Sequence, residues 1–227
     1  MTRRMPFVLT AFALFACAAL AMAATHYSGG PLPSKTGAPA DAGHPGEPDC
    51  TECHITVDGE GMPIDNLDVA GGHVSVLDLP AYYAPGRTYT LRVELACDSS
   101  AVAILPRWGF QLTALDATGA TAGTFGVRDA DTVQVVHSGA GPWADRWYVE
   151  HGPYGNRDGD PGPVQWSFDW TAPAAPVGTI TFRLAGNAAN GSEEPSGDWI
   201  FTSSATVLDT TTAVRRVSWG EVKRGRR

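Results

Sequence analysis

The chain has 227 residues, of which 43% are hydrophobic and 18% are charged, and its formal net charge is −8 at pH 7. This length fits one domain with a substantial hydrophobic core and short flanking segments. An acidic protein repels phosphate groups, so we expect no nucleic-acid partner.

The first 23 residues have the pattern of a secretory signal peptide. Two arginines precede about 17 apolar residues, and Ala-Met-Ala at 21–23 offers a small-x-small cleavage site. An uncleaved anchor is the alternative, but this apolar stretch is at the lower limit for crossing a bilayer. A lipoprotein would use Cys17, where the bulky Phe15 fits a lipobox poorly. We therefore expect residues 1–23 to be removed and the mature protein to be periplasmic or secreted.

The segment from residue 24 to residue 72 is rich in Gly, Pro and Asp and shows no sustained period. Such a segment buries little surface by itself, so we expect an additional element, such as a covalently attached cofactor, to order it. At the other end, residues 209–227 form a basic tail in which RRVSWGEVKRGRR, residues 215–227, has six basic residues and one acidic residue. This tail fits contact with an anionic membrane surface or an acidic partner, and a solvated terminus is the simpler interpretation.

Between residues 73 and 208 the sequence alternates between apolar and polar residues in short runs that end at turn residues. Alternation with a period of two predicts half-buried strands, and no window of ten or more residues shows a helical period. The predicted strands lie at 73–79, 88–95, 107–116, 121–127, 132–137, 146–151, 165–170, 179–184 and 199–208. We therefore expect an all-β protein, an Ig-like antiparallel β-sandwich of seven to nine strands.

Three tryptophans, Trp108, Trp166 and Trp170, fall on the apolar side of predicted strands. We expect them to fill the core rather than to bind sugars. The segment NRDGDPG, residues 156–162, alternates Asn and Asp as calcium loops do, but it has proline where such a loop requires glycine and serine where it requires glutamate. We expect an acidic turn there and no calcium.

The segment CTECH, residues 50–54, has the spacing of a c-type haem attachment motif. In this chemistry the thiols of Cys50 and Cys53 add to the two haem vinyl groups, and His54 becomes the proximal iron ligand. One alternative is a local disulfide between the two cysteines. A zinc site is another, but the chain has no second CxxC or paired histidines to complete it. We expect one covalent haem c, with Cys97 left as a buried free thiol.

The iron of such a haem needs a sixth ligand or an open site. We favour His151, because in RWYVEH it shares a strand phase with Trp147 and Val149 and therefore points toward the sandwich interior or its rim. An inward histidine is also often a satisfied core residue. His73, at the start of the first predicted strand, is the second candidate. Two histidine ligands favour an electron carrier, whereas an open site would allow small-ligand binding or peroxide chemistry.

Seven segments are distinctive when taken together: YSGGPLPSKTGAP (27–39), CTECH (50–54), YAPGRTYTL (83–91), WGFQLTA (108–114), YVEH (148–151), WSFDWTAP (166–173) and FRLAGNAANG (182–191). With them the chain resembles the bacterial Reeler-like proteins known as choice-of-anchor V domain proteins, which are similar to the Reelin N-terminal (Reeler) domain. The resemblance implies an exported Ig-like β-sandwich with a CxxCH in its N-terminal segment and a histidine late in the sandwich. It therefore favours haem attachment and His151 as the distal ligand.

Reeler domains in animals occur in extracellular matrix proteins and beside redox modules in ferric-reductase-like membrane proteins, so the resemblance implies no substrate. Unlike anchored members of the family, the sequence shows no transmembrane span or sorting module after residue 208. We therefore expect a periplasmic or secreted protein without an anchor.

Two functions stay open at this point. The first is a single-haem c-type redox protein that exchanges electrons with a partner protein in the cell envelope, with Cys50 and Cys53 binding the haem and His54 and His151 binding the iron. The second is a non-catalytic extracellular binding or adhesion module in which the two cysteines form a disulfide. An enzyme ranks third, because no Ser/His/Asp order, carboxylate pair or phosphate loop can be argued from the sequence.

Overall fold

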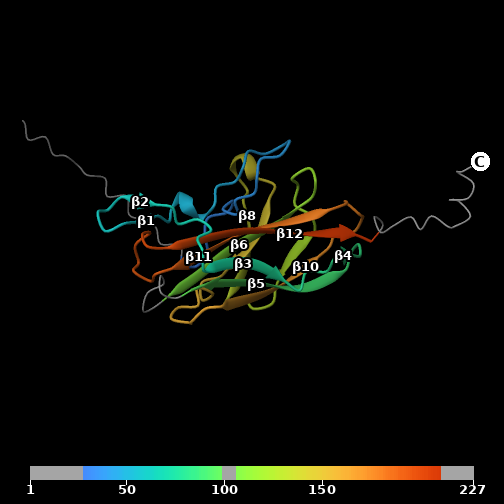
Figure 1. Ribbon diagram of the computed structural model, residues 1–227. Coiled ribbons are helices and arrows are strands. Elements are labelled where there is room, and N and C mark those ends of the chain that lie inside the picture. Colours follow the sequence, from blue (N-terminus) through green and yellow to red (C-terminus); the bar gives the residue numbers. More distant parts are fainter. Residues whose placement is uncertain (1–27, 99–105, 211–227) are drawn as a thin grey trace, which may run out of the picture.

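The computed structural model describes residues 28–98 and 106–210. They form two β-sheets packed face to face, with a two-stranded hairpin at one end (Figure 1). The strands are β1 (Thr56–Val57), β2 (Pro63–Ile64), β3 (Gly72–Leu77), β4 (Tyr82–Tyr83), β5 (Thr88–Cys97), β6 (Arg107–Leu115), β7 (Thr124–Val127), β8 (Val133–His137), β9 (Trp147–His151), β10 (Val164–Thr171), β11 (Ile180–Ala189) and β12 (Trp199–Asp209). Two 3-10 turns complete the elements, η1 (Cys50–Glu52) and η2 (Gly141–Trp143).

The smaller sheet has the strand order β3-β5-β10-β7, and the larger sheet has the order β4-β12-β11-β6-β9-β8. Neighbouring strands are antiparallel except for β12 and β4, which pair in parallel. The predicted antiparallel β-sandwich is therefore confirmed, and each of the nine predicted strands is present. The additional strands β1, β2 and β4 have two residues each, which is too short for alternation to reveal.

The apolar faces of the two sheets meet in one core. Trp166 in β10 packs on Phe110 in β6, with ring centroids 4.8 Å apart, and Trp170 packs edge-on against Phe182 in β11 at 5.0 Å. Trp108, Trp166 and Trp170 are all buried, which confirms that they fill the core. Their indole N–H groups donate to main-chain carbonyls, so no buried donor is left unpaired on these rings.

Two details of the strands differ from the expectation. Strand β11 continues beyond the predicted end at residue 184 to Ala189, and it pairs with β6 throughout. The sequence did not predict this second half, because its small residues hide the alternation of apolar and polar side chains. At Gly186 a Cβ would lie 2.9 Å from Leu95 Cδ1, so the close sheet packing requires glycine. Cys97, expected to be buried, is a half-buried free thiol at the end of β5, because the strand leaves the core there.

The N-terminal segment lies on the outer face of the larger sheet and is held there by its own polar contacts. Gln111 in β6 accepts from Lys35 N at 2.6 Å and donates to Leu32 O at 3.0 Å. Gln134 in β8 donates to Gly29 O at 2.8 Å. The additional element that was expected to order this segment therefore includes polar side chains on the outer face of the sheet, which satisfy its main chain.

A buried ionic cluster, which we call the N-terminal clasp, fixes the same segment further along. It consists of Asp41, Glu47, Arg146 and Tyr148. The buried Arg146 donates to Glu47 Oε1 at 2.7 Å and pairs with Asp41, and Tyr148 Oη donates to Glu47 Oε1 at 2.7 Å. Charges buried in this way are stable only when their hydrogen-bonding groups are satisfied. The clasp therefore ties the segment before CTECH to the loop that leads into β9.

Candidate functional site

The CTECH segment forms a tight turn on the outer face of the larger sheet. The side chain of Asp49 caps η1 by accepting from Thr51 N at 2.8 Å, and the main-chain N–H groups of Cys53 and His54 donate to Cys50 O at 3.2 and 2.9 Å. Both cysteines are free thiols, with Cys50 half-buried and Cys53 exposed. The turn therefore holds two thiols and an imidazole within five residues.

The two thiols differ in environment. Burial raises the pKa of Cys50 to about 12, and the neighbouring Asp49 carboxylate acts in the same direction. Lys35 opposes this shift but is itself paired with Glu52. Because a thiol reacts as its thiolate, Cys50 in this conformation is a weak nucleophile at neutral pH, whereas Cys53 is open to solvent.

His54 is oriented by a buried carboxylate. Its Nδ1 lies 2.6 Å from Oδ2 of Asp198, which is 1% exposed. An ionised carboxylate only accepts hydrogen bonds, so Nδ1 carries the proton and Nε2 keeps its lone pair. Histidines that bind metals typically donate their second N–H in this way. The imidazole side chain is 35% exposed.

Gly109, a residue of β6 without a side chain, lies on the part of the larger sheet that His54 contacts through Asn187. Asn187 Nδ2 lies 3.1 Å from His54 Nδ1, and Asn187 pairs with Gly109 across β11 and β6. At Gly109 a Cβ would lie 2.7 Å from Cε1 of His151, so the His151 ring occupies the space where a side chain would point. His54 and His151 therefore flank the same point of the larger sheet, although the sequence separates them by almost one hundred residues.

His151 ends β9 and is 6% exposed. Its strand phase predicted a side chain that points toward the sandwich interior or its rim, whereas its ring lies against Gly109, on the outer face of β6. Its Nδ1 lies 3.2 Å from Phe110 N and 3.3 Å from Phe110 O. Burial lowers the pKa of His151 to about 4, so the ring is neutral at neutral pH. When Nδ1 accepts from Phe110 N, the proton of the neutral ring is on Nε2; in the other tautomer Nδ1 donates to Phe110 O, and only then does Nε2 keep the lone pair that a metal requires.

The donor set fits a c-type haem. Two neighbouring thiols, an imidazole fixed by a carboxylate and a second neutral imidazole are the groups that this attachment uses. Asn187 Oδ1 is buried and has no hydrogen-bond partner among the described residues, while Asn187 Nδ2 faces the protonated Nδ1 of His54. With the amide oxygen and nitrogen exchanged, the oxygen would accept from His54 Nδ1, so Asn187 helps to orient His54. His73 does not share this place, because it lies on β3 in the smaller sheet, 3.4 Å from Glu94 Oε1.

Three of these residues, Gly109, Asn187 and Asp198, were not singled out from the sequence. Alternation in β11 does place Asn187 on the polar side of its strand, which is a weak signal. Across residues 28–98 and 106–210 no group of three or more His, Cys, Asp and Glu side chains is placed to hold a metal ion.

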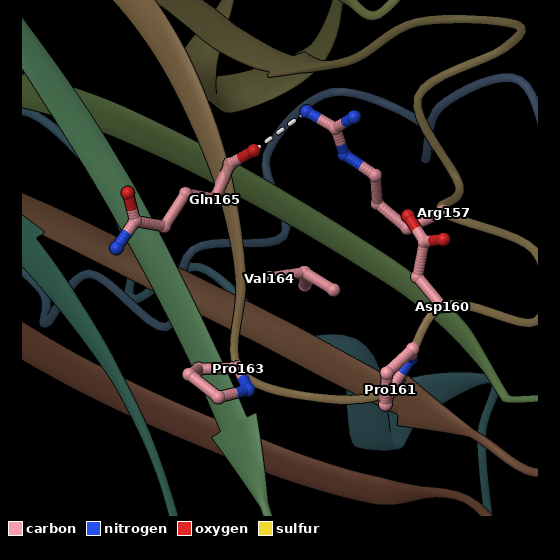
Figure 2. Close-up of a pocket in the computed structure, with 6 residues that line it drawn as sticks. All are labelled: Arg157, Asp160, Pro161, Pro163, Val164 and Gln165. Atoms are coloured by element: carbon pink, nitrogen blue, oxygen red, sulfur yellow. Dashed lines mark hydrogen bonds between the residues drawn. The ribbon is translucent and has the colours of Figure 1, made fainter.

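A separate shallow pocket of about 270 Å³ lies at the loop that joins β9 to β10 and at the start of β10, and it is drawn in Figure 2. Arg157 Nη2 donates to Gln165 O at 2.6 Å there, and Asp160, Pro161 and Pro163 form the other side. The expected acidic turn at 156–162 borders this pocket. Asp158 pairs with an arginine of β6 at 3.3 Å, so this carboxylate is engaged in holding the turn.

No protein-family model and no curated protein matches the sequence. Among solved structures, the human F-spondin reeler domain is 20% identical over 62% of this chain and 89% of that chain, with a TM-score of 0.38. The Reelin-N domain of F-spondin is 17% identical over 70% of this chain and 94% of that one, with a TM-score of 0.38. The sixth cohesin of Acetivibrio cellulolyticus scaffoldin B, solved in complex with a dockerin, is 11% identical over 58% of this chain and 98% of that one, with a TM-score of 0.33.

The signal peptide at 1–23 and the basic segment at 215–227 lie outside the described residues, so both stay predictions. Within the part of the chain that the structure describes, no helix is long and apolar enough to cross a bilayer.

Proposed function

We propose that this Reeler-like protein is an exported electron carrier with one covalent haem c. The observation that carries the proposal is the hydrogen bond between His54 Nδ1 and Asp198, since it leaves Nε2 free for iron. Cys50 and Cys53 would hold the haem through thioether bonds, and His151 would be the distal ligand. The bound haem would supply a one-electron couple.

The residues of the chain have distinct tasks in this proposal. Asp198 fixes the tautomer and orientation of His54 and increases the basicity of its Nε2. His151 is held by the main chain of Phe110 and is kept neutral by burial. Gly109 leaves room for the His151 ring on the outer face of β6. Two imidazole ligands favour electron transfer over catalysis, because neither iron position is left for substrate.

The test is a pyridine haemochrome spectrum, together with intact mass, of protein exported from a host that matures c-type cytochromes. We expect a c-type α-band and one added haem mass. The double variant Cys50→Ala/Cys53→Ala should be exported without colour. Wild-type apoprotein mass with the loss of two hydrogens would reject the proposal and identify a disulfide.

An extracellular binding module is the second candidate, and one observation favours it. The N-terminal clasp orders the segment around CTECH by protein contacts alone, so the fold is complete as a plain β-sandwich. In that case the Cys50→Ala/Cys53→Ala variant would match the wild type in absorption, and its melting temperature would fall only by the contribution of a short disulfide loop.

A further inference from the structure

Exposed apolar side chains gather on the hairpin that follows CTECH. Ile55, Val57, Met62 and Ile64 lie within ten residues, and Met62 is 62% exposed. The other large apolar side chains that are exposed in the described residues are spread over different strands and loops, such as Val127 and Val177. In Figure 1 the hairpin formed by β1 and β2 projects from one end of the sandwich. We call residues 55–64 the apolar hairpin.

The apolar hairpin is tied to the candidate haem site by Asp198. Thr56 Oγ1 donates to Asp198 O at 2.8 Å, while the side chain of Asp198 holds His54. Ile55 N donates to Pro195 O at 2.7 Å, which fixes the base of the hairpin to the loop between β11 and β12. The hairpin is thus a fixed surface directly beside the residue that would bind iron.

Acidic side chains surround these apolar groups. Asp58, Glu60 and Asp65 are exposed, and residues 55–86 contain no lysine or arginine. Asp58 accepts from the main-chain N–H groups of Glu60 and Met62, so it also shapes the turn. The side chain of Glu60 forms no hydrogen bond with the residues that the structure describes. The surface therefore combines an apolar centre with a negative border.

We propose that the apolar hairpin is the docking surface for the redox partner, a protein whose own apolar patch is bordered by lysine and arginine. This inference rests on the proposed function, because it names the partner of the haem site. Opposite charges speed the encounter of two proteins, and a small apolar contact suits an exchange in which the complex must separate quickly. The complementary charge selects a basic partner over an acidic one.

The experiment uses haem-loaded full-length protein and measures the second-order rate constant of electron exchange with a basic and an acidic monohaem cytochrome. We expect the triple variant Val57→Ser/Met62→Ser/Ile64→Ser to exchange about tenfold more slowly with the basic cytochrome, which corresponds to about 1.4 kcal/mol. The control is Val127→Ser/Val177→Ser, which removes exposed apolar groups elsewhere and should leave the rate unchanged.

A second variant does not depend on the packing of the hairpin. Glu60→Lys should slow exchange with the basic cytochrome, flatten its decrease with added salt, and speed exchange with the acidic one. All variants should keep the absorption spectrum, the midpoint potential and the rate of reduction by dithionite. Unchanged rates in both hairpin variants, or a wild type that prefers the acidic cytochrome, would overturn the docking proposal. A colourless wild type would instead show that the proposed function has failed, and the docking proposal would fall with it.

Discussion

Asp198 lies 144 residues after His54 in the chain, yet its carboxylate is 2.6 Å from His54 Nδ1. The histidine belongs to an irregular segment, and the aspartate directly precedes strand β12 of the larger sheet. A main-chain N–H of the β11–β12 loop donates to Asp198 Oδ1 at 3.0 Å and fixes the carboxylate. The imidazole of His54 is thus oriented by residues of the β-sandwich rather than by the CxxCH turn itself.

This arrangement predicts the effect of Asp198→Asn. Under the proposed function, haem attachment should persist, since both cysteines remain, but the midpoint potential should rise, because a neutral amide would make His54 a weaker electron donor to iron. The loss of a charged hydrogen bond should also lower the free energy of unfolding by about 1.5–3 kcal/mol. Potentiometric titration and urea unfolding measure the two effects. Asp65→Asn, which removes a nearby exposed charge, is the control, and equal shifts in both variants would contradict the assigned role.

Gly109→Ala should disturb His151 specifically. The added methyl group would lie 2.7 Å from the imidazole, so the ring must move and the free energy of unfolding should fall by about 1–3 kcal/mol. In haem-loaded protein the six-coordinate spectrum should change to a five-coordinate one. Gly126→Ala is the matched control, because a Cβ at Gly126 meets its nearest atom at an ordinary 3.5 Å. The assignment of His151 would fail if Gly109→Ala kept the wild-type spectrum.

The N-terminal clasp should contribute much of the stability of the segment before CTECH. Arg146→Met leaves Glu47 buried without its cation, so the free energy of unfolding should fall by about 3–5 kcal/mol. Limited proteolysis should then cut between residues 28 and 49. As a comparison, Arg92→Met removes an exposed pair with Asp78 and should lower the free energy of unfolding much less, because solvent screens the two charges. Similar losses for both variants would show that burial of the clasp has no special effect.

The raised pKa of Glu150 predicts that the free energy of unfolding decreases as the pH rises toward neutral. Burial raises its pKa from 4.5 to about 7, while hydrogen bonds from Gln111 and Gln134 oppose the shift. The folded state therefore favours the protonated carboxyl, and this stability is present below pH 4.5 and is lost as the pH rises through about 7. The total loss is on the order of 3 kcal/mol. This contribution changes between pH 4.5 and about 7. Glu150→Gln should remove it from the free energy of unfolding measured with urea over this range, whereas the exposed Glu60→Gln should not.

In the protein without haem, the titration of His151 changes the free energy of unfolding in the opposite direction. Its pKa is lowered from 6.5 to about 4, so its contribution is present above pH 6.5 and is lost as the pH falls toward 4. Between pH 4.5 and 6.5 the two groups oppose each other, and we expect the stability of the wild type to be nearly flat there. In Glu150→Gln the stability should instead rise through this range. A flat profile in both proteins would contradict the assignment.

Alternation in the sequence was enough to predict nine strands and the buried tryptophans, because each depends on contacts that repeat every second residue. The same rule failed for the two-residue strands of the apolar hairpin, which are fixed by bonds to the β11–β12 loop. His151 was singled out by its strand phase, but that phase did not reveal that its ring lies against Gly109 on the outer face of β6. Asp198 and Arg146 were not, since the carboxylate and guanidinium acquire their roles only when irregular segments meet the sheet. Such pairings have no local pattern, although a charged residue next to a strand is a weak sign.

The clasp also sets an order of events in maturation. Glu47 pairs with Arg146, which lies 99 residues later in the chain. In this folded state the Cys50 thiol, three residues after Glu47, is half-buried and protonated. A chain that is exported from its N-terminus presents CTECH outside the membrane well before Arg146 arrives. Under the proposed function, the enzymes that attach haem have this interval in which both thiols are open. The time needed to export about one hundred residues, rather than the stability of the finished fold, would then decide how much of the protein carries its cofactor.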